Sequence, residues 1–398
     1  MLGGDPPHFL STFALLRKVG ARRLDEQDRI KNVSSVGRKC LAQSEGTGEI
    51  MINARLVDLL ASRKMRNDLM LVALALLIFI STGLTATGKP AGISFNTGGP
   101  WPFHERDKLT GARMFAEGIV STNGNEFGGV FTPDGKEFYF TRSVPQSYFY
   151  MICVSRLKDG KWSEPEAAPF SGRYRDFDAV ISPDGSKLYF VSDRPVDGKA
   201  KADYDIWLVE RIQSGWSEPK NLGSPINTDG SEWFASVSRF GTLYFAADRS
   251  GGFRSTHIFR SRLINGKYSE PEKLSGGINS ENIETEPYIA PDESFLLFSS
   301  YGREGGSGDW DIYISYNHNG EWTDVQNLGP KINTSTRDYS PRLTPDGKYL
   351  FFTSERNFYG RRLEKHLRYQ ELRNDLRSTL NGNGNIYQIE LDLLGTKP

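Results

Sequence analysis

One phrase recurs along this chain at intervals of just over fifty residues, and this regular spacing restricts the fold more than any other feature of the sequence. The clearest copy spans residues 177–219 and ends in Trp-Ser-Glu-Pro. Repeats of constant length bury their hydrophobic faces against one another, so the period predicts units that stack or close into a ring. The middle of the first turn of each unit is occupied by Asp134, Asp184, Phe240, Asp292 and Asp346.

Each unit predicts four short antiparallel strands. In the clearest copy, residues 179–182 and 188–191 flank Pro183-Asp184-Gly185, whose residue types favour a tight turn. Residues 205–209 form a third apolar run, and residues 216–222 a short fourth one that contains a proline. Proline is tolerated only at the edge of a sheet. Four antiparallel strands with such an outer strand are typical of a β-propeller blade.

Five such units are present, so we expect an all-β fold, a β-propeller of five four-stranded blades. The alternative is six blades, with a partial blade within residues 89–124. The fifth unit has only three strands before the sequence ends. Residues 115–121 precede the first unit and have no other strand partner, so we expect them to close the ring as the missing strand of the last blade.

The first 88 residues differ from the repeats. Residues 1–64 are rich in Lys and Arg and carry no strand phrase, and we interpret them as a leader that is disordered or not translated. The apolar run at residues 69–80 is shorter than the roughly 20 residues of a membrane span. Its basic flank and the small residues after it predict a signal peptide within residues 65–88. The repeat region, residues 89–398, is then periplasmic or secreted without a stable membrane span, and an uncleaved signal anchor is the alternative.

The fifth unit is interrupted at about residues 358–384, between its second and third strands. Leu367, Leu372, Leu376 and Leu380 recur there at near-helical spacing among charged residues. This pattern predicts a short amphipathic helix in a loop insertion. Such insertions often mark the functional rim of a fold, and a tolerated surface excursion is equally consistent with the pattern.

Charge and cysteine content narrow the possible partners. The formal net charge is zero and no polybasic patch is present, so nucleic acid is not an expected partner. Of the two cysteines, Cys40 and Cys153, only the second lies in the repeat region, so no disulfide is expected there.

The repeated phrase Ser/Thr-Pro-Asp-Gly-x-x-Leu/Phe-Tyr-Phe-x-Ser-Asp-Arg resembles the TolB-type β-propeller repeat, a WD-repeat-like family of bacterial exported and envelope proteins. The resemblance covers about residues 115–394. It implies a propeller fold, in a family that includes protein-binding scaffolds, domains that gate substrates to serine peptidases, and a few polysaccharide lyases. The implied partner is an envelope protein, a peptide or a glycan.

An acidic residue precedes the apolar part of every first strand. The first strands of a propeller line its central channel, so these carboxylates are expected to ring one mouth of it: Glu126, Asp176, Glu232, Glu284 and Asp338. Two units carry a second carboxylate, Asp178 and Glu286. The second strands return to the same mouth and end at or near Arg142, Arg194, Arg249, Arg303 and Arg356.

Two interpretations of this ring remain open. In one, each carboxylate pairs with a nearby arginine or accepts backbone N–H groups, which offsets the repulsion between like charges. In the other, the ring binds a hard cation such as Ca²⁺ or the cationic part of a ligand. No other cofactor is expected. Aromatic residues near the same loops would suit a sugar or a peptide: Trp101, Tyr174, Trp233, Tyr301 and Tyr339.

Catalytic signatures are lacking in the sequence. There is no Gly-x-Ser-x-Gly elbow and no phosphate-binding loop, and the histidines have no metal-ligand spacing. Two carboxylates facing each other across the channel could nevertheless serve a glycosidase. We therefore expect a non-catalytic propeller that binds a protein, peptide or envelope glycan at the channel mouth, with a carbohydrate-active lyase or glycosidase as the alternative.

Overall fold

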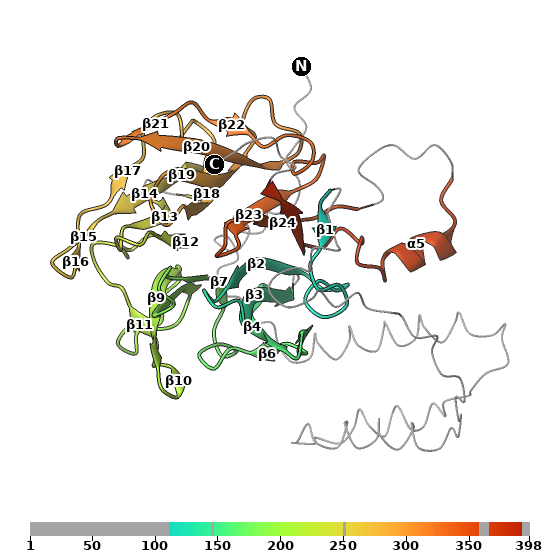
Figure 1. Cartoon of the computed structure of the whole chain (residues 1–398), viewed down its shortest axis with the longest axis horizontal. Coiled ribbons are helices and arrows are strands. Elements are labelled where there is room, and N and C mark those ends of the chain that lie inside the picture. The colour runs from blue at the N-terminus through green and yellow to red at the C-terminus, as the bar shows by residue number, and fades with distance from the viewer. Residues whose placement is uncertain (1–110, 145–146, 250–251, 358–365, 392–398) are drawn as a thin grey trace, which may run out of the picture. The chain divides into compact units, whose positions relative to one another are not determined.

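The structure is a computed structural model, and it describes residues 111–391 apart from 145–146, 250–251 and 358–365 (Figure 1). The predicted leader and signal peptide, and Trp101, lie outside the described residues. Within the described part of the chain, no helix is long and apolar enough to cross a membrane.

Five antiparallel sheets follow one another along the chain, and each is one blade. The first strands are β2 (Glu126–Phe131), β7 (Asp176–Ile181), β12 (Glu232–Val237), β18 (Ile283–Ile289) and β23 (Asp338–Leu343). The second strands are β3 (Glu137–Val144), β8 (Lys187–Ser192), β13 (Leu243–Asp248), β19 (Phe295–Tyr301) and β24 (Tyr349–Ser354). The third strands are β4 (Phe149–Lys158), β9 (Asp205–Ile212), β14 (Thr256–Ser261), β20 (Trp310–His318) and β25 (Asn385–Glu390).

The outer strands are only two residues long, and such short edges limit pairing with other chains. They are β6 (Glu166–Ala167), β11 (Lys220–Asn221), β17 (Glu272–Lys273), β22 (Gln326–Asn327) and β1 (Arg113–Met114). Short hairpin strands precede four of them: β5 (Lys161–Trp162), β10 (Gly215–Trp216), β15 (Leu263–Ile264) with β16 (Lys267–Tyr268), and β21 (Glu321–Trp322). Helical segments are η1 (Phe253–Ser255) and α5 (Tyr369–Asp375).

The first strands form the inside of a closed ring. Each contacts the first strand of the next blade, and β23 of the last blade contacts β2 of the first (Figure 1). The prediction of an all-β, five-bladed propeller is confirmed.

The N-terminal strand closes the ring at a slightly different place than predicted. It is β1 that pairs with β25, so the prediction of a strand at residues 115–121 is wrong: the closing strand ends at Met114, just before that segment. Phe115 still donates its N–H to the carbonyl of Ile386, but its side chain then turns inward. Residues beyond it bend through left-handed conformations at Ala116 and Gly118, which end the strand. The closing strand is therefore only two residues long.

The hydrophobic core is divided among the seams between blades. Each of five clusters joins two neighbouring blades; at one seam, Ile206 of β9 packs in the same cluster as Phe245 of β13. The repeat tryptophans Trp162 and Trp322 are buried in such clusters. Cys153 is a buried free thiol of the seam that closes the ring. A blade is therefore stabilised mainly by the blades beside it.

Every first strand contains a β-bulge at the same position, where the register with the second strand shifts. The residue at the bulge has a left-handed backbone conformation in all five blades. A bulge bends the strand and re-aims its side chains. This position, which we call the bulge position, is held by Gly128, Asp178, Phe234, Glu286 and Ser340.

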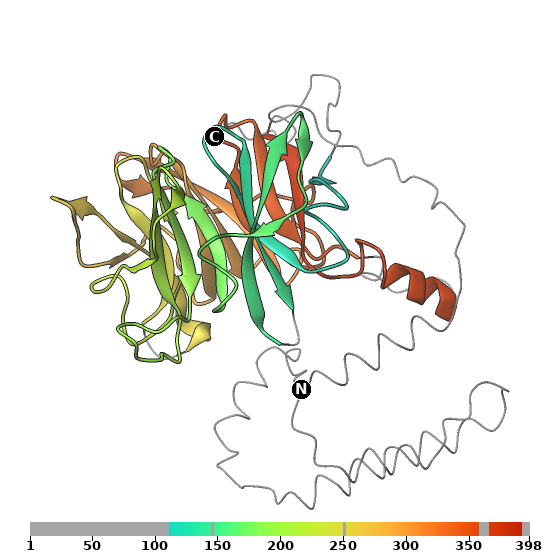
Figure 2. The same cartoon turned by 90° about the horizontal axis from the view of Figure 1, so that it is seen from below.

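The predicted helix of the insertion is present but short. It covers Tyr369–Asp375 of a pattern that ran from residue 364 to residue 380. The helix stands away from the blade sheets (Figure 2). After the helix, the chain contacts the segment that precedes the first blade: the side chain of Asn381 donates to the carbonyl of Asn123 at 2.9 Å.

We predict that Phe115→Ala lowers the free energy of unfolding by about 3–5 kcal/mol, the usual cost of removing a buried phenylalanine. Phe115 is 4% exposed and contacts the rings of Phe131, Phe138, Trp162 and Phe351. Urea denaturation measures the change. The matched control is Phe240→Ala, because Phe240 is 61% exposed and its removal is expected to change stability by less than about 0.5 kcal/mol. Equal losses in the two variants would show that ring closure does not depend on Phe115.

Candidate functional site

The five predicted ring carboxylates are buried, and each forms an ion pair with the predicted arginine of its own blade. All five acidic side chains have no exposed surface. Because the acid lies at the start of the first strand and the arginine lies at or just beyond the end of the second, each pair fastens one end of the hairpin. The pairs are Glu126–Arg142 at 3.1 Å, Asp176–Arg194 at 2.6 Å, Glu232–Arg249 at 3.9 Å, Glu284–Arg303 at 3.1 Å and Asp338–Arg356 at 3.7 Å.

Each pair also holds the chain segment that arrives from the preceding blade. In four blades a Thr or Ser four residues before the acid donates both its N–H and its hydroxyl to the carboxylate: Thr122, Thr228, Ser280 and Thr334. In the remaining blade, the carboxylate of Asp176 accepts from the Ser192 hydroxyl at 2.6 Å. The arginines donate to carbonyls of the same segments, as Arg303 does to Ile278 at 2.6 Å.

These contacts favour the first interpretation of the ring, in which paired charges hold blade to blade. They do not test whether the same residues bind a ligand, which stays a prediction. Among the described residues, no group of three or more His, Cys, Asp or Glu side chains is placed to hold a metal ion. Binding of Ca²⁺ likewise stays a prediction.

A second set of charges lies on the same first strands, about two to four residues after the ring carboxylates. Asp178 and Glu286 occupy the bulge position in the second and fourth blades, and Arg342 follows the bulge in the fifth blade. Their exposed fractions are 1%, 5% and 3%. We call these three residues the channel cluster.

Arg342 was missed by the sequence analysis, although the repeat alignment contains a signal for it. In the aligned first strands, the residue that pairs just after the bulge is Val130, Val180, Ser236, Tyr288 or Arg342. Only the fifth blade has a charge there. A charged residue at a position otherwise filled by uncharged ones is a departure from the repeat that points to a special environment.

The three charged groups of the channel cluster influence one another's pKa values, because they are buried away from solvent. Burial raises the pKa of Asp178 well above its ordinary value, the negative charge of Glu286 raises it further, and Arg342 opposes the rise. Burial also raises the pKa of Glu286 and lowers that of Arg342. The cluster therefore combines two carboxyl groups with one guanidinium group where water provides little screening.

Hydrogen bonds satisfy only part of the channel cluster. The carboxylate of Glu286 accepts from the N–H and the hydroxyl of Ser340, both at 2.8 Å. Arg342 donates Nη1 to the carbonyl of Pro341 at 2.7 Å. Within the described part of the chain, both carboxylate oxygens of Asp178 and Nε of Arg342 are buried without a hydrogen-bond partner.

The neighbouring blade leaves space for Asp178 by using glycine. A Cβ added at Gly128, the bulge residue of the first blade, would lie 2.7 Å from Oδ1 of Asp178. The N–H of Asp178 donates to the hydroxyl of Thr141 in that blade at 3.0 Å. The carboxyl group is thus held against the first blade, although it belongs to the second.

Aromatic side chains lie around the mouth of the channel nearest this cluster. Their ring centroids are 5.0–6.5 Å apart and form an unbroken chain of contacts across four blades, from the fifth through the first and second to the third. Burial raises the pKa of Tyr150 to about 12, and the charge of Asp178 adds to the rise, so the two side chains lie near each other. We call these residues the aromatic arc: Tyr339, Phe127, Tyr150, Phe177 and Phe234.

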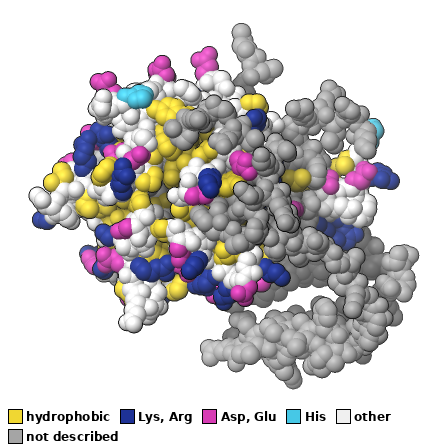
Figure 3. Space-filling view, viewed as in Figure 1, with side chains coloured by type: hydrophobic (Ala, Val, Ile, Leu, Met, Phe, Trp, Pro, Cys, Tyr) yellow, Lys and Arg dark blue, Asp and Glu magenta, His cyan; other side chains and the backbone are white. Residues whose placement is uncertain are grey.

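A second aromatic group lies beside the third and fourth blades, where Trp233 contacts Phe253, and Trp310 contacts both Phe253 and Tyr301. Three aromatic residues expected near the mouth, Trp233, Tyr301 and Tyr339, therefore belong to these two groups. Figure 3 shows hydrophobic side chains gathered toward the middle of the face that it presents.

Tyr174, also expected at the mouth, instead packs against arginines. The guanidinium groups of Arg173 and Arg194 lie 5.2 Å and 5.4 Å from the centroid of its ring. Its ring thus supports the buried pair of the second blade.

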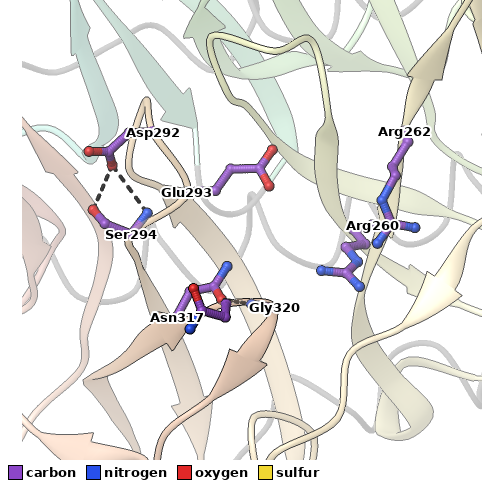
Figure 4. A pocket seen from close by; sticks show the side chains of 8 residues that line it. Arg260, Arg262, Asp292, Glu293, Ser294, Asn317 and Gly320 are labelled. Carbon is purple, nitrogen blue, oxygen red and sulfur yellow. Dashed lines mark hydrogen bonds between the residues drawn. The ribbon is translucent and has the colours of Figure 1, made fainter.

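A separate pocket of about 420 Å³ lies at the opposite end of the strands, between the third and fourth blades (Figure 4). It is lined by Arg260 and Arg262 on one side and by turn residues, including Asp292 and Asn317, on the other. Both arginines already pair with Glu272, at 2.5 Å and 2.6 Å. We assign no ligand to this pocket.

Comparisons with known proteins give only distant similarities. No family model matches the sequence, and no curated protein matches it. Among solved structures, an α-L-arabinofuranosidase from Lactobacillus brevis is 13% identical, over 67% of this chain and 90% of that one, with a TM-score of 0.40. The β-propeller domain of the Trilobed protease from Pyrococcus furiosus is 11% identical, over 51% of each chain, with a TM-score of 0.29. Similarities this distant give no information about activity or ligand.

We predict that Gly128→Ala destabilises the propeller more than Gly160→Ala does, by about 1–3 kcal/mol, the usual range for overpacking. Both glycines have left-handed conformations, but an added Cβ at Gly160 meets no atom within 4 Å. The difference between the two variants therefore isolates the contact with Asp178. Urea denaturation measures it, and the double variant Gly128→Ala/Asp178→Ser is expected to recover part of the loss. Equal losses at the two glycines would contradict the proposed packing.

We also predict a pH dependence of stability that originates at Glu232. Burial raises its pKa from 4.5 to about 7. The folded chain then binds more protons than the unfolded chain between these pH values, so stability falls as pH rises from about 4.5 to about 7. In the wild type this deprotonation lowers the free energy of unfolding by at most about 3 kcal/mol across this pH range, and Glu232→Gln is expected to abolish that decrease. Urea denaturation across this range measures it, with exposed Glu218→Gln as the control. Parallel profiles for wild type and Glu232→Gln would refute the assignment.

Proposed function

We propose that this protein is an exported, non-catalytic propeller that binds an envelope glycan, a peptide or a segment of an envelope protein at the aromatic mouth of its channel. The aromatic arc is the observation that carries the proposal. Except for Phe177, its members are only partly buried. Flat aromatic faces beside a polar recess suit ligands with both apolar and hydrogen-bonding surfaces.

The ring of acid–arginine pairs supports a binding function over a catalytic one. A general acid or base needs a carboxyl group that can reach a reacting atom. All five ring carboxylates are fully buried and engaged by arginine and by hydroxyl or N–H donors. Their contacts hold blades together, and this leaves the loops and the channel mouth for recognition.

A glycosidase is the second candidate, and a different observation favours it. Asp178 and Glu286 face one channel from different blades, and burial raises the pKa of both. Pairs of carboxyl groups in contrasting environments supply the acid and the base of glycoside hydrolysis. The contrast here is that Glu286 accepts two hydrogen bonds from Ser340, whereas Asp178 accepts none from the described residues.

We predict that the double variant Phe127→Ala/Tyr150→Ala loses about 10-fold or more in affinity for the ligand, because buried aromatic contacts dominate binding energies. Glycan and peptide arrays identify the ligand, and calorimetry measures its affinity for each variant. Phe240→Ala is the control, because that ring is exposed in a turn at the other end of the strands. Thermal melting confirms that the variants are folded. Unchanged affinity in the double variant would remove the aromatic arc from the binding site.

The same arrays separate the two candidates. A binding protein returns every bound oligosaccharide intact after long incubation. Release of shorter sugars by the wild type, abolished by Asp178→Asn, would instead establish the glycosidase.

A further inference from the structure

The channel cluster contains one unused acceptor group and one unused donor. Both oxygens of Asp178 and Nε of Arg342 are buried without a partner among the described residues. A buried polar group that lacks a hydrogen bond destabilises the folded state, and a charged group does so more strongly. Native structures avoid this cost unless another molecule provides the missing contact.

We propose that the channel cluster binds a neutral sugar, with a sugar hydroxyl donating to Asp178 and accepting from Nε of Arg342. This inference rests on the proposed function and names the ligand class. A hydroxyl group is both a donor and an acceptor, so a single group matches the two unused partners.

Charged ligands fit the cluster less well. A protonated amine would pair with Asp178, but it would leave Nε of Arg342 without an acceptor and would repel the guanidinium group. A carboxylate or phosphate would pair with Arg342, but it would meet the two carboxyl groups of Asp178 and Glu286. The neutral hydroxyl avoids both conflicts in a site where water screens charges weakly.

The position of the cluster limits how much of the ligand can enter. Asp178 and Arg342 are exposed by only 1% and 3%, so only a narrow terminal group reaches them. The hydroxyl groups at the end of an oligosaccharide are of this size. The aromatic arc lies near Asp178, since its member Phe177 directly precedes Asp178 in β7. The remaining part of the sugar chain would then pack against the arc.

Asp178→Asn is the variant that tests the proposal. Asn tolerates the left-handed conformation found at residue 178, where φ is 53°, so the variant is expected to fold. It keeps the shape of the side chain and replaces one acceptor oxygen by an amide nitrogen. The matched control is Asp197→Asn, an exposed aspartate that also has a left-handed conformation, with φ of 50°.

The full-length protein and both variants are titrated with four kinds of probe. They are neutral tetrasaccharides (cellotetraose, xylotetraose and arabinotetraose), a glucosamine tetramer, a galacturonate tetramer and neutral hexapeptides. We expect a neutral tetrasaccharide to bind the wild type more tightly than the charged sugars. Asp178→Asn is expected to weaken it about 10- to 100-fold, the range for a hydrogen bond to a charged group, and Asp197→Asn to leave it unchanged.

The alternative outcomes separate the two proposals. If only the hexapeptides bind, the sugar site is overturned but the binding function is kept. The same holds if wild type and Asp178→Asn bind a tetrasaccharide equally well. Preference for the glucosamine or galacturonate tetramer also overturns it. Absence of binding by all four probes counts against both. If Asp178→Asn does not fold, a crystal structure of the wild type with the bound tetrasaccharide decides: a sugar hydroxyl on Asp178 supports the proposal, and a water there with the sugar elsewhere refutes it.

Discussion

The ring depends on a buried acid–arginine pair that is repeated in every blade. Burying an isolated carboxylate or guanidinium group is costly, so each charge needs its partner and further hydrogen bonds. The structure supplies both, because Thr or Ser groups and backbone carbonyls of the preceding segment complete the pair in most blades. The contact therefore joins three parts of the chain: a first strand, a second strand and the connection from the previous blade.

The acid–arginine pairs hold the ends of the hairpins, so the bulge positions within the first strands can differ between blades. All five blades have the same bulge and the same left-handed conformation, yet the bulge residues are Gly128, Asp178, Phe234, Glu286 and Ser340. The repeat therefore keeps its backbone at the bulge but varies its side chains there. Places where a sequence departs from its own local rules are where function is expected.

Much of the fold could be predicted from the sequence, and much less of the site. The Pro-Asp-Gly turns and the apolar runs beside them act locally, so strand number, blade number and closure by the N-terminus followed from them. The closing strand was misplaced because Phe115 turns into a seam formed by residues far away in sequence. Arg342 was missed because its importance depends on Asp178 and Glu286, which lie on other blades.

The sequence by itself determined the repeat, and with it the propeller and the positions of Glu126, Arg142 and their equivalents within each unit. Each of these follows from residues within one unit or at its border, where spacing along the chain fixes spacing in the fold. Only the tertiary structure brought Asp178, Glu286 and Arg342 together, since they lie on three different blades. The same closure removed water from them, and burial decided which of their hydrogen bonds remain unmade.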